Sequence, residues 1–181
     1  MKWLTWNWTD VLSQKDIKEI NKIIKKHSVK AKDKPANSTK TSKVKFVLYG
    51  HLRSCLDNCL QEIYRSNEIN FNNLNIYPYD NNTHVHCNIY NKNSEYDWHI
   101  DANDKNDEWD IKYTVLINIS DKKYTGGKFK IFVNNKPKHF KYFDEPGSMM
   151  MFRSHILHKV TPVTSGERKT LTLFITGPGL K

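Results

Sequence analysis

Two short stretches of the chain carry side chains that together could hold a metal ion and an acidic ligand. The first reads WHID at residues 98–101, and the second contains His158 and Arg168. His99 and Asp101 are two residues apart, so on an extended strand both side chains point to the same face. With His158 they form a set of two imidazoles and one carboxylate, which suits non-haem Fe(II) and leaves one side of the metal open. The guanidinium of Arg168 matches a carboxylate through two parallel hydrogen bonds, so it could hold an acidic co-substrate.

The residues around these two stretches make the pattern more specific. Tyr90 stands nine residues before His99, and a Gly126-Gly127 turn lies between the two stretches. From residue 158 the chain reads HKVTPVTSGER, which fits H-x-V-x-P-V-x-x-G-x-R at every position. Over roughly residues 90–178, about half of the chain, the sequence resembles the prolyl 4-hydroxylase-like family of Fe(II)- and 2-oxoglutarate-dependent dioxygenases.

The resemblance implies a role for each residue of the two stretches. His99, Asp101 and His158 would bind Fe(II), which 2-oxoglutarate chelates through its 2-keto and C1-carboxylate oxygens. Arg168 would bind the far C5 carboxylate of 2-oxoglutarate, and it therefore belongs with the three metal ligands to the catalytic set. Charge-assisted hydrogen bonds contribute about 1.5–3 kcal/mol each, so the loss of Arg168 should weaken co-substrate binding strongly.

Tyr90 and Thr114 occupy positions that in relatives hydrogen-bond the same C5 carboxylate. The resemblance also implies the reaction, in which O2 oxidatively decarboxylates 2-oxoglutarate to succinate and CO2 while the substrate is hydroxylated. Ascorbate is a candidate reductant. Because related sites that lack the carboxylate ligand can bind halide, the presence of Asp101 favours hydroxylation over halogenation.

Hydrophobic periodicity predicts two helices followed by a series of short strands. The first helix begins at Ser13, which can form a capping box with Asp16, and ends near Lys26 or His27. The second covers roughly residues 51–66, and the apolar stripes of both helices should pack on one outer face of a sheet. The predicted strands, with a hairpin turn at Asn134-Asn135, are 75–79, 84–91, 95–100, 112–120, 128–133, 137–142, 148–152, 158–163 and 169–176.

Short strands in this number predict a mainly β fold of the α+β kind, the double-stranded β-helix or jelly-roll (cupin) barrel. At 181 residues we expect a single dioxygenase domain with the iron in the mouth of the barrel. Residues 1–74 would form a mainly helical N-terminal support with a basic loop near 30–45, and residues 75–181 the jelly-roll core. The basic loop precedes the barrel and is a candidate substrate lid.

The chain lacks the features expected of a secreted or membrane-spanning protein. No apolar run approaches the roughly 18 residues of a transmembrane helix, and the first residues do not read as a signal peptide. The three cysteines are an odd number and suggest reduced thiols. We therefore expect a cytoplasmic protein, in a host cell if the source is viral, with no membrane partner; its oligomeric state is unknown.

The substrate is the least determined part of the sequence analysis. The motif spacing is closest to the prolyl hydroxylases, so the leading hypothesis is a protein or peptide hydroxylated at proline. Another residue type or a free amino acid remains open. A third alternative, a non-catalytic binding module, would be expected to lack a metal ligand or Arg168, and this chain lacks neither.

Nucleic acid is a further alternative, which the net charge of +10 suggests. The lysines are scattered along a helix and several loops, however, which is typical of a solvated surface. Arg168 is followed by KTLTLFIT, without the second arginine of the R-x-N-x-T-x-R pattern in dioxygenases that repair alkylated bases. The sequence therefore favours a protein substrate over nucleic acid.

Overall fold

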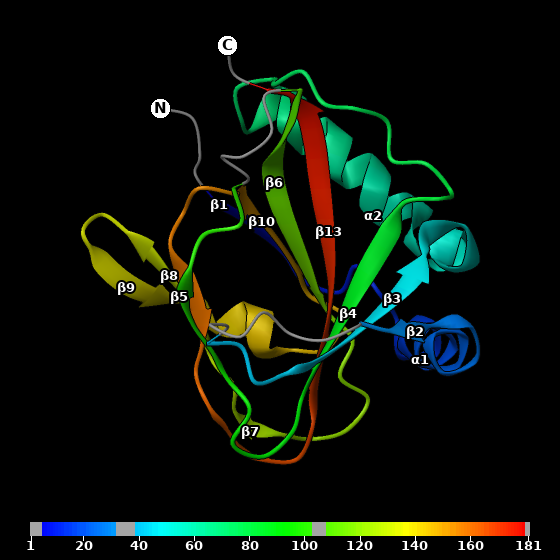
Figure 1. Cartoon of the computed structure of the whole chain (residues 1–181), viewed down its shortest axis with the longest axis vertical. Helices are drawn as coiled ribbons and strands as arrows, with labels where there is room; N and C mark the ends of the chain where they lie inside the picture. Colours follow the sequence, from blue (N-terminus) through cyan, green and yellow to red (C-terminus); the bar gives the residue numbers. More distant parts are fainter. Residues whose placement is uncertain (1–4, 32–38, 103–107, 180–181) are drawn as a thin grey trace.

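Two β-sheets stacked face to face form the body of the protein in the computed structural model, which describes residues 5–31, 39–102 and 108–179 (Figure 1). The large sheet contains, in spatial order, β1 (Thr5–Trp8), β10 (Met149–Arg153), β6 (Trp109–Asn118), β13 (Arg168–Pro178), β4 (His84–Tyr90), β3 (Lys43–Leu48) and β2 (Val29–Lys30). The small sheet contains, in spatial order, β5 (Tyr96–His99), β11 (His158–Val160), β8 (Phe129–Val133) and β9 (Lys136–His139). A third pair joins β12 (Val163–Ser165) to β7 (Thr125–Gly126).

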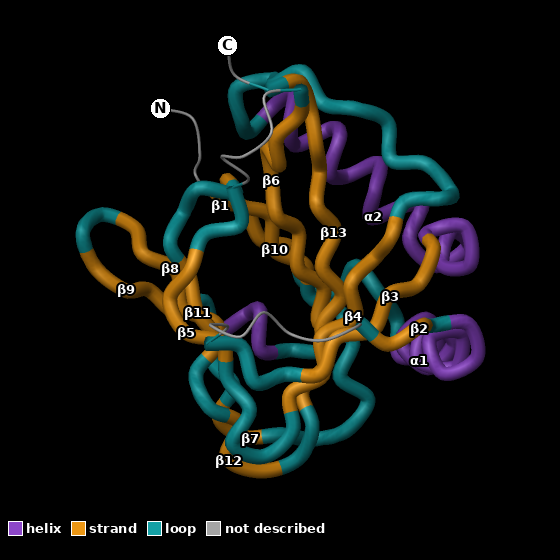
Figure 2. The backbone as a smooth tube through the Cα atoms, in the orientation of Figure 1, coloured by secondary structure: helices purple, strands orange, loops and turns teal. Residues whose placement is uncertain are grey.

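The two helices cover the outer face of the large sheet, on the side away from the small sheet (Figure 2). Helix α1 (Gln14–His27) begins with a capping box, in which the Ser13 hydroxyl accepts from the Asp16 backbone N–H and the Asp16 carboxylate accepts from the Ser13 N–H. Helix α2 (Tyr49–Ile69) packs beside α1. Neither of these described helices combines the length and apolar character that crossing a membrane requires.

Two hydrophobic clusters fill the two layers of the molecule, one between the helices and the large sheet and the other between the two sheets. Strand β13 contributes to both layers because its side chains alternate in direction. Its helix-facing residues are Leu171, Leu173 and Ile175, and the residues that face the small sheet are Arg168, Thr170, Thr172 and Phe174. The same strand thus builds the core with one face and a pocket with the other.

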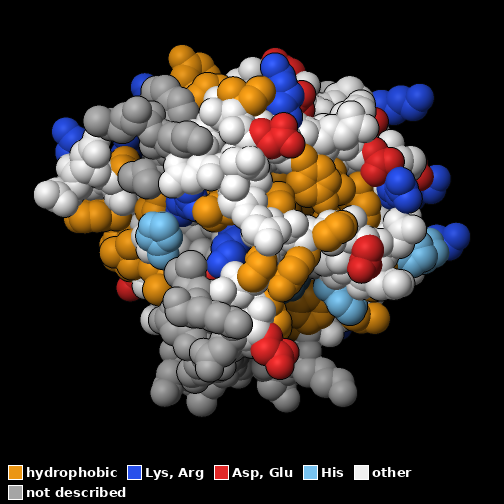
Figure 3. All heavy atoms as spheres, turned by 90° about the horizontal axis from the view of Figure 1, so that it is seen from above, with side chains coloured by type: hydrophobic (Ala, Val, Ile, Leu, Met, Phe, Trp, Pro, Cys, Tyr) orange, Lys and Arg blue, Asp and Glu red, His pale blue; other side chains and the backbone are white. Residues whose placement is uncertain are grey.

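Charged side chains are interspersed on the face seen in Figure 3. Lysine and arginine side chains form separate groups there, with acidic and hydrophobic side chains between them. This face shows no continuous basic surface among the described residues, which agrees with the scattered lysines of the sequence.

The mainly β jelly-roll class and the first helix agree with the sequence predictions. The second helix is longer than the predicted 51–66, since it begins at Tyr49 and ends at Ile69. Asn134 and Asn135 have left-handed φ angles of 52° and 58° between β8 and β9, as a tight hairpin turn requires.

Several strand predictions are wrong. Residues 75–79 form no strand; Tyr77 donates one backbone hydrogen bond to Thr176, and the next residue, Pro78, has no N–H to continue a ladder. The predicted strand 137–142 ends at His139 and is followed by a short 3₁₀ helix, Lys141–Asp144. The predicted strand 158–163 is interrupted after Val160, before β12 begins.

The predicted boundary between a helical support and the barrel is also wrong. Strands β1, β2 and β3 come from the first 74 residues, and all three belong to the large sheet. The basic loop near 30–45 is shorter than predicted, because β3 begins at Lys43. Residues 32–38, the centre of the candidate lid, lie outside the described residues.

Substitution of the helix cap tests the start of α1. Ser13→Ala should lower the free energy of unfolding by about 1 kcal/mol, because it removes the side-chain acceptor of the Asp16 N–H. The measurement is urea unfolding at neutral pH, with the exposed Lys18→Ala as a matched helix control.

The capping box also predicts that the effect of Ser13→Ala on stability depends on pH. The hydrogen bonds from Ser13 hold the pKa of Asp16 below its usual value in the folded state. The stabilisation from this pair is therefore fully present above the unfolded pKa of about 3.9 and is lost as the pH falls through the lower folded pKa. The difference in unfolding free energy between the native protein and Ser13→Ala should shrink at a pH of about 2. A difference that does not change with pH would show that the Asp16 carboxylate does not contribute to the cap.

Candidate functional site

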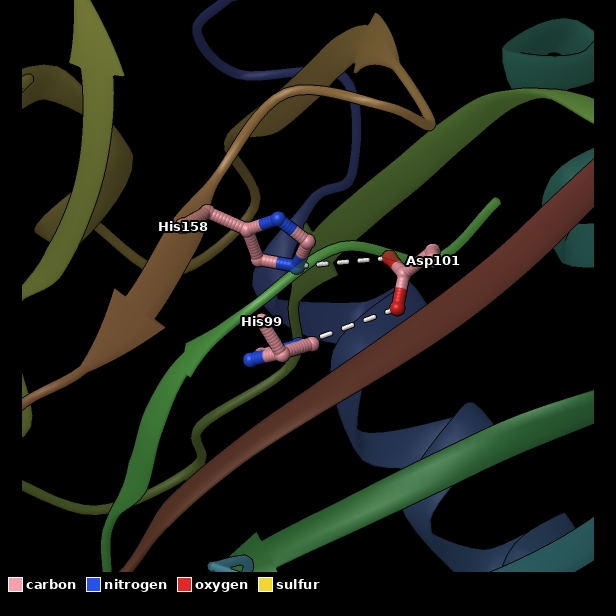
Figure 4. Close-up of side chains that lie close together, drawn as sticks. All are labelled: His99, Asp101 and His158. Atoms are coloured by element: carbon pink, nitrogen blue, oxygen red, sulfur yellow. Dashed lines mark ion pairs between the residues drawn. The ribbon is translucent and has the colours of Figure 1, made fainter. Parts of the chain in front are cut away.

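Three side chains converge beside the small sheet (Figure 4). His99 ends β5, Asp101 follows two residues later, and His158 begins β11 directly opposite His99 in the antiparallel register. The Asp101 carboxylate lies 3.3 Å from His158 Nε2 and 3.7 Å from His99 Nε2. The three candidate ligand atoms all lie within 4.8 Å of one another, so they can bind one metal ion.

Both imidazoles are held in the orientation that a metal ligand requires. His99 Nδ1 lies 2.7 Å from the carbonyl oxygen of Asp97, and His158 Nδ1 lies 2.8 Å from that of Ile156. A carbonyl oxygen can only accept, so each Nδ1 carries the proton and each Nε2 presents its lone pair to the centre of the cluster. Burial, together with the nearby His158, lowers the pKa of His99 to about 4, so this ring is neutral at neutral pH.

Asp101 is fixed by one hydrogen bond that its carboxylate accepts from the large sheet and one that its backbone donates to the chain after β10. The Thr114 hydroxyl, on β6, donates to Asp101 Oδ2 at 2.8 Å, and the Asp101 backbone N–H donates to the Ser154 carbonyl at 2.9 Å. Burial acts to raise the pKa of Asp101, but His158, His99 and Thr114 together outweigh it and hold the pKa below its usual value. The site therefore presents two imidazoles and one ionised carboxylate, a donor set suited to a divalent cation.

A pocket between the two sheets extends from these three side chains. One wall consists of alternate residues on the paired strands β4 and β13, in which Tyr90 lies opposite Arg168, Asn88 opposite Thr170 and His86 opposite Thr172. Apolar side chains complete the lining, among them Leu116 from β6 of the large sheet and Phe129 and Val160 from the small sheet.

Arg168 is the feature of the pocket that indicates an acidic ligand. Its side chain is only 2% exposed, and among the described residues none of the ion pairs involves it. The rings of Tyr90 and Phe143 lie 5.3 Å and 5.8 Å from its guanidinium carbon. Burying a cation costs stability unless an anion accompanies it, so the guanidinium fits the carboxylate of a bound ligand.

The Gly126-Gly127 turn gives Arg168 the room to adopt this position. Gly127 has a φ of +57°, and a Cβ added there would lie 2.9 Å from Cδ of Arg168 and 2.9 Å from Cγ2 of Val163. Any other residue at 127 would therefore displace the arginine side chain. The turn glycine is part of the construction of the pocket although it is remote from the metal ligands in sequence.

The structure brings together five of the six predicted site residues. The pocket is lined by His99, Asp101, His158, Tyr90 and Arg168. Thr114 is fully buried but does not line the pocket, because its hydroxyl is directed at Asp101. The prediction that Thr114 binds the co-substrate carboxylate is therefore wrong, and its contact is with a candidate metal ligand.

Among the pocket residues that were not identified from the sequence are His86, Tyr96 and Lys40. His86 could have been found, because strand alternation places it on the same face as Tyr90. Tyr96 stacks on the His99 ring at 3.4 Å between centroids, but one tyrosine in an aromatic-rich chain gives little signal. Lys40 is one of several lysines in a polar stretch, and nothing in the sequence distinguishes it from its neighbours.

The contact of Thr114 can be tested by Thr114→Val, which keeps the shape of the buried side chain and removes the hydrogen bond to Asp101. Loss of such a partner typically weakens metal binding about 10- to 100-fold. Anaerobic Fe(II) titration should show this loss with little change in thermal unfolding. Thr176→Val, on the neighbouring strand β13, is the control; equal Fe(II) affinity in all three proteins would show that Asp101 needs no support from Thr114.

Comparison with solved structures shows the same fold in several prolyl hydroxylases. A Pseudomonas putida prolyl-4-hydroxylase has a TM-score of 0.73 and 15% identity, with 97% of this chain and 94% of that chain covered. A viral collagen prolyl hydroxylase from Paramecium Bursaria Chlorella virus-1, in complex with 2-oxoglutarate, has a TM-score of 0.70 and 17% identity, with 97% of both chains covered.

A third similar structure contains a peptide. It is a prolyl hydroxylase from Trichoplax adhaerens in complex with a peptide fragment of the hypoxia inducible factor oxygen degradation domain, with a TM-score of 0.70 and 17% identity. The alignment covers 95% of this chain and 83% of that chain. No curated protein sequence matches the chain at a significant level.

A family model described as the 2OG-Fe(II) oxygenase superfamily matches residues 84–176, which is half of the chain. The match begins with β4, extends into β13 and includes all five residues that the sequence predicts for the pocket lining. The donor set fits Fe(II), and the buried guanidinium fits an acidic co-substrate. The chain therefore belongs to the 2OG-Fe(II) oxygenase superfamily and is a 2-oxoglutarate-dependent dioxygenase with a prolyl 4-hydroxylase-like fold.

Proposed function

We propose that the chain hydroxylates a prolyl residue of a protein or peptide, with Fe(II) bound by His99, Asp101 and His158. The observation that carries the proposal is the position of the buried Arg168 in the same pocket as the three metal-binding groups. The choice of a prolyl substrate is supported by the likeness in fold to prolyl hydroxylases, one of them solved with a peptide fragment.

When bound, Fe(II) supplies a coupled oxidation, in which O2 and 2-oxoglutarate give succinate and CO2 and one oxygen atom enters a substrate C–H bond. The side chains of the chain bind and orient the reactants. Arg168 donates two parallel hydrogen bonds to the C5 carboxylate of 2-oxoglutarate. Tyr90 lies beside this guanidinium, and burial raises the pKa of its phenol, so the hydroxyl stays protonated and can donate to the same carboxylate.

The remaining contacts in the site keep the ligands in position and water away. The carbonyls of Asp97 and Ile156 hold the two imidazoles, and Thr114 holds the carboxylate of Asp101. The apolar lining between the sheets excludes water from the co-substrate, which strengthens the ion pair at the guanidinium.

One prediction of the proposed function concerns the binding of the metal and the co-substrate. Anaerobic addition of Fe(II) and 2-oxoglutarate to the native protein should give a visible metal-to-ligand charge-transfer band. His99→Ala should abolish the band, because it removes a metal ligand. Arg168→Ala should keep the band but weaken 2-oxoglutarate binding about 100-fold or more, since two charge-assisted hydrogen bonds of about 1.5–3 kcal/mol each are lost.

Arg153→Ala is the matched control for Arg168→Ala. Arg153 lies over the rings of Phe71 and Tyr113 and does not line the pocket. This variant should bind 2-oxoglutarate like the native protein. A native protein that is folded and loaded with iron yet gives no band would refute the assignment of the ligands.

A further prediction of the proposed function concerns the substrate. Peptides that contain proline should stimulate succinate formation, and the peptide should gain the mass of one oxygen atom at a prolyl residue. The comparison set contains the same peptides with alanine in place of proline, lysine- or asparagine-containing peptides, free L-proline and single-stranded oligonucleotides. If one of these is hydroxylated and the proline peptides are not, the prolyl substrate is wrong. The dioxygenase assignment then stands, with that compound class as the substrate.

A further inference from the structure

His86 and Arg168 line the same wall of the pocket but lie far apart along it. In the register of β4 and β13, Tyr90 lies opposite Arg168, whereas His86 lies opposite Thr172. Four residues of β4 separate the two pairs, which corresponds to about 13 Å along the strand. The C5 carboxylate of a co-substrate bound at Arg168 is therefore remote from His86.

His86 belongs to the part of the wall that lies near the metal-binding groups. Phe174, the next pocket residue after Thr172 on β13, lies opposite Thr114 of β6. The Thr114 hydroxyl donates to the carboxylate of Asp101, so this level of the large sheet also supports a candidate metal ligand. The ring of His86 contacts that of Phe174. A molecule that reaches the metal from this side therefore passes His86.

The pocket is buried at its Arg168 end and more accessible to solvent at its metal end. Arg168 and Tyr90 are both buried. The pocket-lining residues His86, Tyr96 and Phe174 are only half-buried. A substrate that enters from solvent therefore meets these three aromatic side chains, while the co-substrate carboxylate occupies the buried end.

The imidazole of His86 is held by two phenyl rings, which come from the strands on either side of β4 (Figure 1). The ring centroids of Phe46 and Phe174 lie 4.7 Å and 5.0 Å from that of His86, at interplanar angles of 72° and 89°. These edge-to-face contacts fix the ring and need neither of its nitrogen atoms. Among the described residues, His86 has no hydrogen-bond partner. Both nitrogen atoms can therefore contact a bound molecule.

This imidazole is neutral at neutral pH. Burial lowers the pKa of His86 to about 4, and the nearby Lys40 and His84 act in the same direction. Asp101 acts in the opposite direction and is outweighed. A neutral imidazole offers one N–H donor and one acceptor nitrogen. Every peptide bond, including the one before proline, has a carbonyl that can accept from such an N–H, whereas proline itself has no backbone N–H.

We propose that His86 is a specificity-determining residue whose imidazole N–H donates to a peptide carbonyl next to the hydroxylated position. The inference rests on the proposed function and defines its substrate class further, as a polypeptide that is recognised through its backbone. The carbonyl belongs to the residue before the proline or to the proline itself, and the two sources can be separated experimentally.

The test uses three probes that differ in the carbonyls around one proline. The full probe is acetyl-Ala-Ala-Pro-Ala-Ala-amide. The second probe begins with proline and lacks the carbonyl before it, and the third ends in pyrrolidine and lacks the carbonyl of proline itself. The kcat/KM of each probe is measured with the native enzyme and with His86→Phe, which keeps an aromatic ring and removes the donor.

His86→Phe should lower kcat/KM for the full probe about 3- to 10-fold, mainly through KM, as the loss of one neutral hydrogen bond predicts. The truncated probe that lacks the bound carbonyl should show equal kcat/KM in the two enzymes, because the interaction is already absent. The other truncated probe should show the same loss as the full probe. Equal kcat/KM for the full probe in the two enzymes, or a loss that persists with both truncated probes, overturns the inference.

Two further variants assign the effect to the donor at residue 86. His86→Gln supplies an amide N–H in place of the imidazole N–H and should restore part of the lost kcat/KM. His84→Phe is the matched control, because His84 is an exposed histidine two residues earlier on β4 and does not line the pocket. His84→Phe should behave like the native enzyme with all three probes.

Two further measurements separate this inference from a role in co-substrate binding and from the proposed function. The 2-oxoglutarate affinity of His86→Phe, titrated by the charge-transfer band, should match that of the native protein; a large loss would assign His86 to the co-substrate and overturn the inference. If no probe is hydroxylated, prolyl hydroxylation fails, and calorimetric binding of the probes to the Mn(II)- and 2-oxoglutarate-loaded protein becomes the test. The same pattern across probes and variants then supports backbone recognition by His86, and its absence overturns it.

Discussion

Strand β13 crosses the middle of the large sheet, with the helices on one side and the pocket on the other. Its alternation places leucine and isoleucine side chains in the helix-side core and Arg168 among the pocket residues. A shift of its register by one residue would exchange these two sets and bury a guanidinium among hydrocarbons. Pairing with β4 on one edge and β6 on the other fixes the register. The position of the co-substrate cation therefore depends on the same pairing that builds the core.

The metal-binding groups are tied to both layers in a comparable way. The two histidines belong to neighbouring strands of the small sheet, and each ring is held by the carbonyl of the residue two positions earlier. The carboxylate of Asp101 is held from the large sheet through Thr114. A change in the spacing of the two sheets would therefore separate the carboxylate from the imidazoles. The contacts between the two sheets thus determine both the stability of the fold and the geometry of the site.

Much of the site could be predicted because its chemistry uses residues at fixed sequence spacing. His99 ends β5 and Asp101 follows two residues later, while the segment from His158 runs through β11 and β12 to Arg168 at the start of β13. The short separation of these residues in sequence therefore limits their separation in space. Thr114 was misassigned because spacing places it on the right strand, while the direction of its hydroxyl depends on Asp101. Lys40 could not be recognised, since its proximity to the site arises from pairing across more than fifty residues of sequence.

The fold shows the same division between local and long-range information. The capping box and the isoleucine stripe of α1 are local, so both were read from the sequence. Strands β1, β2 and β3 are short edge or near-edge strands with mixed polar character, and only their partners in the large sheet make them strands. Residues 75–79 show the reverse case, in which a strand-like composition forms one backbone hydrogen bond with β13 but no ladder, because Pro78 has no N–H.

Some of the lysines of the chain lie at exposed edges of the two sheets, where they have a role apart from the substrate. Strand β9, at one edge of the small sheet, reads KPKH, and β2, at one edge of the large sheet, is two residues long and includes Lys30. Lysine, proline and short length each discourage a strand edge from pairing with another molecule. Part of the net charge of +10 thus lies where it keeps copies of the chain from joining edge to edge. In colloidal terms, these lysines favour dispersal of the protein at high concentration, whatever substrate the pocket accepts.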